Sequence, residues 1–194
     1  MKHELSGFVG RYSSNGLRRL ISSLNSIRFR DDVGEVEYFG QKVVLLRRDA
    51  FSLIRKELSR VAGTASGVIL EVAGHRVGSE EGIVLSSKAE GLGLNNPEAL
   101  PEFIRTAVEE SNMGFGKMQV KELEIPTGKA VVVVQNSFEA EDAGVSLRPI
   151  CRFTSGYLEG IFGQLTGKNM RAKEIECRAK GDTDCKFILA LSTS

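Results

Sequence analysis

The sequence predicts a mixed α/β (α+β) fold in which helices pack on a mainly antiparallel sheet. Segments with helical spacing of apolar residues alternate along the chain with short strand-like segments, and two final strands are joined by a turn at Gly181-Asp182. Hydrophobic residues make up 41% and charged residues 26% of the 194 residues, which is typical of a globular domain with a real hydrophobic core.

The first half of the chain is expected to contain an amphipathic helix, two short strands and two longer helices. Asn15 is a plausible cap for the first helix. Asp49 is expected to cap the second, with Leu53 and Ile54 among its inward-facing residues. The expected ranges are 17–27 for the first helix, 36–39 and 42–46 for the strands, 49–60 for the second helix, and 64 to the late eighties for the third.

Glycines recur at intervals of four in the third of these helices. Gly63 and Gly67 form one group, and Gly74, Gly78 and Gly82 form another. Each glycine costs a helix roughly 1 kcal/mol relative to alanine, so several in register need compensation. The stripe indicates either a dimer face or ligand-lining wall, or tight packing against another helix or breaks in the helix itself.

The second half is expected to contain two further helices and four strands. The continuous apolar run at 130–134 is typical of a strand buried on both faces, and residues 139–144 are expected to form an acidic loop. The helices are predicted at 97–113 and 149–167, and the strands at 117–125, 130–134, 170–179 and 185–191.

Residue usage excludes several kinds of chemistry. The chain has no Trp and only two histidines, His3 and His75, which excludes His-rich metal centres and HExxH metalloproteases. Three cysteines cannot all pair within one chain, which argues against a secreted disulfide framework. The start of the chain lacks the apolar stretch of a secretory signal, and the longest run without a charge is ten residues, too short for a membrane span. A soluble cytoplasmic protein is expected.

Charge divides the chain into two expected parts. Residues 1–30 carry six cations and one anion, whereas the rest carry 20 cations and 24 anions. We therefore expect a basic N-terminal segment over residues 1–40, which includes the first helix, followed by a domain over residues 41–192. The basic segment is interpreted as a solvated helix face, in preference to a contact with nucleic acid, an anionic membrane or an acidic partner subunit.

All three cysteines lie in the last quarter of the chain. If the final turn centres on Gly181, Cys177 and Cys185 face each other across the hairpin, close enough to share one metal ion. Cys151, at the start of the preceding helix, could supply a third thiolate, and a fourth ligand could come from nearby carboxylates. Three thiolates without histidine favour structural Zn²⁺ in a tetrahedral site. The alternatives are buried unreactive cysteines, a cross-strand disulfide or a redox thiol. The candidate carboxylates are Glu174, Glu176, Asp182 and Asp184.

The same residues carry a resemblance to a known family. The stretch Cys151-Arg-Phe-Thr-Ser-Gly-Tyr-Leu-Glu-Gly, followed by Glu174-Ile-Glu-Cys177 and Gly181-Asp-Thr-Asp-Cys185-Lys-Phe, resembles the 4-vinyl reductase (4VR) domain family. The resemblance is specific over residues 150–190 and weaker back to about residue 42. It implies that Cys151, Glu174, Cys177 and Cys185 hold zinc, as in the related sensor domains of phenol-responsive transcription activators. Strict strand alternation puts Glu174 and Cys177 on opposite faces, so we expect a β-bulge or strong twist between them.

The resemblance also implies a fold and a kind of function. It implies the α/β fold of TRAPP vesicle-trafficking subunits and haem-nitric-oxide-binding-associated domains, which surrounds an apolar cavity and is usually dimeric. The related sensors bind phenol through a His and a Trp, so a hydrophobic or lipid-like molecule is a better candidate here. The expected ligand-binding residues are Val132, Val134, Phe153, Tyr157, Ile161 and Phe162, with simple core positions as the alternative for each.

The sequence therefore favours a non-enzymatic, zinc-stabilised domain that forms a homodimer, binds a small hydrophobic molecule and acts through a protein partner. One alternative is a TRAPP-like scaffold. The other is an accessory factor or enzyme in tetrapyrrole vinyl reduction, which is disfavoured because no cofactor-binding fingerprint is present. The adjacent pairs Glu80-Glu81 and Glu109-Glu110 face different directions on a helix and make poor acid/base partners.

Overall fold

The computed structural model describes residue 16 and residues 27–192, apart from residues 39–40, 112 and 142. The described residues form a three-stranded sheet in the order β1-β2-β3 and a four-stranded sheet in the order β4-β5-β7-β6. All strand pairs are antiparallel. The predicted α/β fold class, with helices on a mainly antiparallel sheet, is therefore confirmed.

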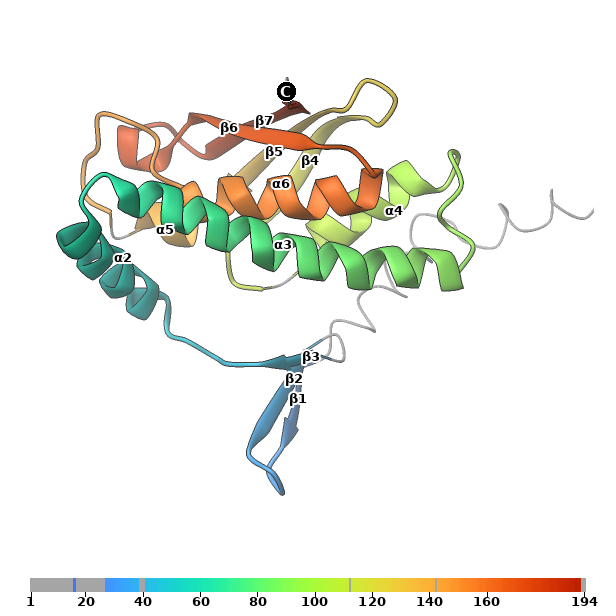
Figure 1. Ribbon diagram of the computed structural model, residues 1–194, viewed down its shortest axis with the longest axis horizontal. Coiled ribbons are helices and arrows are strands. Elements are labelled where there is room, and N and C mark those ends of the chain that lie inside the picture. The colour runs from blue at the N-terminus through green and yellow to red at the C-terminus, as the bar shows by residue number, and fades with distance from the viewer. Residues whose placement is uncertain (1–15, 17–26, 39–40, 112, 142, 193–194) are drawn as a thin grey trace, which may run out of the picture.

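The larger sheet and its helices form a layered body (Figure 1). Helix α6 and helix α4 pack on the four-stranded sheet, and helix α3 packs against α6 on the side away from the sheet. The helices of the body are α3 (Ala65–Gly91), α4 (Leu100–Glu109), α5 (Phe138–Glu141) and α6 (Arg152–Thr166). Its strands are β4 (Lys117–Glu124), β5 (Lys129–Gln135), β6 (Met170–Glu176) and β7 (Cys185–Leu191).

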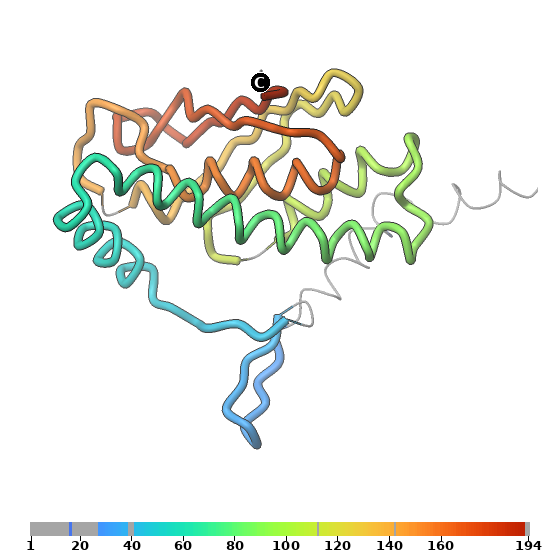
Figure 2. The backbone as a smooth tube through the Cα atoms, in the orientation of Figure 1, coloured from blue at the N-terminus to red at the C-terminus, as the bar shows by residue number. Residues whose placement is uncertain are grey.

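The smaller sheet stands away from this body below α3, and an extended segment leads from it to helix α2 (Figure 2). Its strands are β1 (Ile27–Arg30), β2 (Glu35–Tyr38) and β3 (Gln41–Val43), and α2 covers Arg48–Ala62. The sequence prediction found β2 and β3 but missed β1. The helix predicted at 17–27 lies outside the described residues, and the proposed division at residue 40 stays a prediction.

Helices α3 and α6 approach each other through glycines on both sides. A Cβ atom on Gly74 would lie 2.0 Å from the carbonyl oxygen of Phe153, and one on Gly78 would lie 2.1 Å from that of Tyr157. On the facing helix, a Cβ on Gly156 would lie 1.9 Å from the carbonyl oxygen of Glu71. The glycine stripe is therefore a packing surface within the chain, as the tight-packing alternative predicted.

The core lies between the four-stranded sheet and helices α4 and α6. Strand β5 turns Ala130, Val132 and Val134 into this core, while Val131 and Val133 are only half-buried. The strand is therefore fully buried on one face, and the expectation of burial on both faces is wrong because helices pack on one side of the sheet only.

Two expectations about the connecting segments are also wrong. Leu53 and Ile54 of α2 are exposed, and Asp49 lies within the first turn of that helix, whose cap position is Arg47. The helix touches α3 and α5 rather than lying in the core, so its apolar residues do not all face inward. The predicted acidic loop at 139–144 begins with α5, in which Glu139 is buried.

Candidate metal centre

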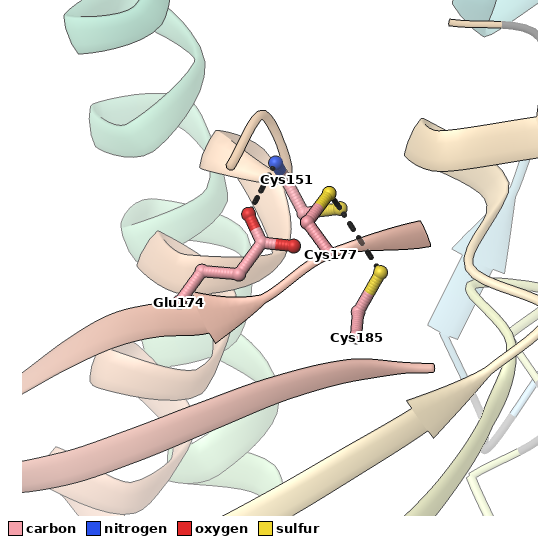
Figure 3. A group of neighbouring side chains, drawn as sticks. All are labelled: Cys151, Glu174, Cys177 and Cys185. Carbon is pink, nitrogen blue, oxygen red and sulfur yellow. Dashed lines mark hydrogen bonds between the residues drawn. The ribbon is translucent and has the colours of Figure 1, made fainter. Parts of the chain in front are cut away.

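Three cysteines and one glutamate come together at one end of the four-stranded sheet. The candidate ligand atoms of Cys151, Glu174, Cys177 and Cys185 all lie within 4.8 Å of one another, and all four residues are buried. Figure 3 shows the three sulfur atoms and the Glu174 carboxylate gathered between the start of α6 and the β6–β7 hairpin. The structure thus brings together the same four residues that the resemblance assigned to zinc.

Each of these side chains is placed by a different local feature. Cys151 is the residue before α6, Glu174 lies in β6, and Cys185 is the first residue of β7. Cys177 precedes the 3-10 helix η3 (Arg178–Lys180), which occupies the end of the strand predicted at 170–179. The β6–β7 pairing shifts register between Glu174 and Glu176, so the expected bulge is present and lets Glu174 and Cys177 face the same site.

The sulfur atoms are spaced as the corners of a metal tetrahedron are spaced. The Cys151 Sγ atom lies 3.6 Å from that of Cys185 and 4.0 Å from that of Cys177. Four ligands at the usual Zn–S distance would hold sulfurs about 3.8 Å apart, whereas a disulfide bond is about 2.0 Å long. All three cysteines are free, so the disulfide alternative does not describe this structure.

The Glu174 carboxylate has one satisfied oxygen and one unsatisfied oxygen. Its Oε2 accepts a hydrogen bond of 2.8 Å from the backbone N–H of Cys151. Its Oε1 is buried and has no hydrogen-bond partner. A buried unpaired carboxylate oxygen is costly, and a cation among the neighbouring sulfurs would satisfy it. Glu176 is exposed and pairs with Lys186 at 3.5 Å, so Glu174 is the carboxylate that faces the cysteines.

Polar groups around the cysteines hold the sulfurs and their loop in place. Ser137 Oγ lies 3.4 Å from Cys151 Sγ, and the backbone N–H of Arg178 donates to Cys185 Sγ at 3.5 Å. Asp182 Oδ2 accepts a 2.8 Å hydrogen bond from the backbone N–H of Cys177, which closes the η3 turn. Contacts of this kind orient the ligands of metal sites and fix their geometry.

The shared burial of these groups perturbs their acidities. Burial raises the pKa of Glu174 to about 8. Hydrogen bonds from the Cys151 and Cys185 thiols hold the pKa of Cys177 well below its ordinary value, and hydrogen bonding to Cys177 and Cys185 raises the pKa of Cys151. Without a cation, the cluster therefore concentrates its negative charge on one thiolate.

The donor set fits zinc and fits no open catalytic site. Three sulfurs and one carboxylate oxygen complete a tetrahedral shell, which is the arrangement of structural zinc sites. Cys151 also lies at the N-terminal end of α6, where the helix dipole favours a thiolate. If zinc is present, Cys151, Glu174, Cys177 and Cys185 are the residues that would hold it.

A second buried glutamate, which the sequence prediction placed in a loop, caps α6 beside this site. Glu139 of α5 accepts hydrogen bonds from the backbone N–H groups of Phe153 and Thr154 at 3.0 and 2.7 Å, and from the Thr154 hydroxyl at 2.6 Å. Burial raises its pKa to about 7 despite these bonds. The only sequence signal for this position is an acidic residue between Phe138 and Ala140, which short apolar context alone does not distinguish from a loop.

The residues expected to bind a hydrophobic ligand occupy the core. Val132, Val134, Tyr157, Ile161 and Phe162 are fully buried there. Phe153 is half-buried and joins an aromatic cluster at the surface of the core, in which its ring contacts those of Phe51, Phe115 and Phe138. The two largely apolar pockets of the described residues are lined by other side chains, so a ligand role for the six stays a prediction.

Comparison with known proteins places this arrangement in a recognised class of domain. Residues 130–191 match the family model of the vinyl-4-reductase (4VR) domain, and this segment contains all four residues of the candidate metal centre. The predicted resemblance to the 4-vinyl reductase family is thus confirmed over this part of the chain. No match was found among curated protein sequences.

Among solved structures, the fold is shared with the phenol-responsive sensory domain of the transcription activator PoxR, solved with phenol. The TM-score is 0.76 at 22% identity, over 93% of this chain and 92% of that one. A vinyl-4-reductase family protein from Methanocaldococcus jannaschii gives a TM-score of 0.44 at 20% identity, covering 78% of this chain and 85% of that one. Subunit 3 of a trafficking protein particle complex from Naegleria fowleri, covalently bound to palmitic acid, gives 0.49 at 14%, covering 76% and 98%. Only the first score is high enough to support a structural argument.

In the part of the chain that the structure describes, no helix combines the length and the apolar character needed to cross a membrane.

Proposed function

We propose that the chain is a zinc-stabilised domain that binds a small hydrophobic molecule and transmits that event to a protein partner. The observation that carries the zinc assignment is the buried cluster of Cys151, Glu174, Cys177 and Cys185, in which Glu174 Oε1 has no hydrogen-bond partner. Ligand binding is supported by the match to the vinyl-4-reductase domain and by the fold shared with a sensory domain that is responsive to phenol.

Zinc bound there would join three separate parts of the fold. It would hold the N-terminal end of α6, strand β6 and the start of β7 to one another. Because the cluster would leave no ligand position open to water, its role would be structural. We therefore propose that the protein works by binding and has no catalytic reaction of its own.

The binding part of this proposal is tested by extracting small molecules from freshly purified protein. We expect an organic extract, analysed by mass spectrometry, to contain one hydrophobic compound in near-equal amount to the protein. A matched preparation of an unrelated protein from the same host should lack that compound. A protein that folds as described yet carries no compound, and that no hydrophobic compound stabilises against heat, would contradict ligand binding.

The surface of α3 favours a second copy of the chain as one partner. Val68 and Val72 are 64% and 58% exposed on this helix, and Ile69 between them is 45% exposed. Neighbouring exposed apolar side chains commonly mark an interface. We propose that this surface contributes to a homodimer, which would also suit the alternative of a TRAPP-like scaffold.

Light scattering after size-exclusion chromatography tests the dimer. The protein should elute with twice the mass of one chain, and Val72→Glu should shift it to the monomer. Glu90→Gln, on the exposed last turn of the same helix, should leave the mass unchanged. A monomer at all concentrations would contradict the dimer and leave the ligand proposal to its own test.

A further inference from the structure

Two largely apolar pockets meet on the side of α3 that faces the small N-terminal sheet. The first has a volume of about 340 Å³ and the second about 280 Å³. Tyr38, Val43 and Met113 line both, so the pockets adjoin along these three side chains. Each volume is near the lower end of the range of about 300–1,000 Å³ that is typical of small-molecule sites. Together they form an elongated groove, which we call the α3 groove.

The walls of the α3 groove are mostly apolar. Helix α3 contributes Val77 and Val84 at one end. At the other end, the extended segment before α2 contributes Leu45, and the aromatic cluster contributes Phe115 and Phe138. Met113 lies where the two pockets meet, and a flexible thioether side chain adapts readily to ligands of different shape.

One end of the groove contains a partly buried carboxylate. Glu81 lines the first pocket, and its Oε2 accepts a 2.8 Å hydrogen bond from the hydroxyl of Tyr157. Burial raises the pKa of Glu81 above its ordinary value, and Lys88 opposes this shift by its charge. Glu80 and Arg76 also line this pocket but are exposed, so they lie at its rim.

The spacing along α3 explains why Glu81 lies here and Glu80 does not. Gly74, Gly78 and Leu85 are buried positions of this helix, and Glu81 continues their spacing of three and four residues. Tyr157 is on the facing helix α6 and is fully buried, so its hydroxyl fixes one oxygen of the Glu81 carboxylate. The adjacent pair that offered no acid/base chemistry thus contains one residue placed to contact a ligand.

We propose that the α3 groove binds an elongated apolar molecule whose head group, a hydroxyl or an amine, donates a hydrogen bond to Glu81. This inference deepens the proposed function by locating the ligand and naming its chemical class. The apolar walls bury the chain of the ligand, and burial of apolar area drives such binding. The carboxylate selects a donor and repels a ligand that carries its own carboxylate.

Isothermal titration with three ten-carbon probes tests the head-group preference. The probes are 1-decanol, n-decylamine and sodium decanoate, titrated below their micelle-forming concentrations. We expect decanol and decylamine to bind, and decanoate to bind at least about tenfold more weakly. Tighter binding of decylamine than of decanol would identify an amine as the natural head group, and the reverse order a hydroxyl. Decanoate binding as tightly as both would overturn the assignment of Glu81.

Two glutamine variants of adjacent residues then separate the groove from general charge effects. Glu81→Gln should weaken the binding of decylamine about tenfold or more, because the charged acceptor is lost. Glu80→Gln makes the same charge change one residue away and should alter binding by less than about twofold. Equal effects of the two variants would overturn the assignment of Glu81.

A third variant tests the location with a residue that has no role in the head-group contact. Met113→Trp should fill the junction of the two pockets and abolish binding of decanol and decylamine, while circular dichroism and zinc content stay as in the wild type. Unchanged binding would overturn the groove as the site. The proposed function would still stand in that case if a hydrophobic compound co-purifies with the protein.

Discussion

Glu174 and Glu176 lie two residues apart in β6 and differ in surroundings. Glu174 is buried against the cysteines with one unsatisfied oxygen, whereas Glu176 is exposed and pairs with Lys186. We therefore expect Glu174→Gln to weaken zinc binding about tenfold or more, and Glu176→Gln to leave it unchanged. Competition with a chromogenic zinc chelator measures both. A larger effect of Glu176→Gln would reassign the fourth ligand.

Cys177 and Cys185 are expected to depend on each other through the metal. Binding energy at a structural zinc site is folding energy, so Cys177→Ser and Cys185→Ser should each lose zinc and lower the melting temperature by about 5 °C or more. Metal analysis and differential scanning calorimetry give the two quantities. Full zinc content in both variants would exclude these cysteines as ligands.

At the scale of single residues, the sequence predicted the candidate metal centre better than any other feature. Cysteine spacing around Gly181 and the conflict between Glu174 and strand alternation led to the correct position and to the bulge. Glu139 and Glu81 were not recognised, because their roles depend on contacts with α6 that bring distant parts of the chain together. Local sequence patterns do not contain such contacts.

The close pairing of α3 with α6 is the element-scale feature most open to mutation. Gly78→Ala would place a Cβ 2.1 Å from the carbonyl oxygen of Tyr157, and Gly67→Ala would place one no closer than 3.6 Å to the Arg152 side chain. Gly78→Ala should destabilise the fold by about 2 kcal/mol or more. Gly67→Ala should be neutral or stabilise it by up to about 1 kcal/mol, because alanine favours the helix. Urea unfolding compares them, and equal stabilities would contradict the helix contact.

The cap that α5 places on α6 predicts a dependence of stability on pH. The pKa of Glu139 is raised from 4.5 to about 7, mainly by burial, so the folded state binds its proton more tightly than the unfolded state. Its contribution is therefore complete below about pH 4.5 and is lost as the pH rises through about 7.

Wild-type protein should accordingly lose up to about 3 kcal/mol relative to Glu139→Gln between about pH 5 and 8. Urea unfolding at both pH values measures the difference. Glu141→Gln, on the exposed side of the same helix, is the control and should follow the wild type. Parallel pH profiles for wild type and Glu139→Gln would contradict the effect of burial.

Among the elements, long periodic helices were predicted well and short or tertiary elements were not. The range of α3 and the end of α6 at Gly167 follow from apolar periodicity and from a left-handed glycine cap. Strand β1 has only four residues, all exposed, so it has no apolar alternation to reveal it. Helix α5 is four residues long and is held by contacts made through Phe138 and Glu139.

At the scale of the molecule, α5 joins the candidate metal centre to the α3 groove. Ser137, just before this helix, contacts Cys151 Sγ, Phe138 lines the groove, and Glu139 caps α6. A ligand that packs against Phe138 would therefore press on the segment that holds Cys151. We expect decanol to slow zinc transfer to a chelator in the wild type. Met113→Trp should remove this effect, and equal transfer rates with and without decanol in the wild type would contradict the link.

The central claim is that Cys151, Glu174, Cys177 and Cys185 hold one metal ion. Native mass spectrometry of freshly purified protein, followed by denaturation of the same sample, tests it most directly. We predict a mass excess of one zinc ion per chain that disappears on denaturation and leaves three reduced cysteines. A metal-free native mass with three titratable thiols, or a mass two daltons low from a Cys177–Cys185 disulfide, would contradict the claim.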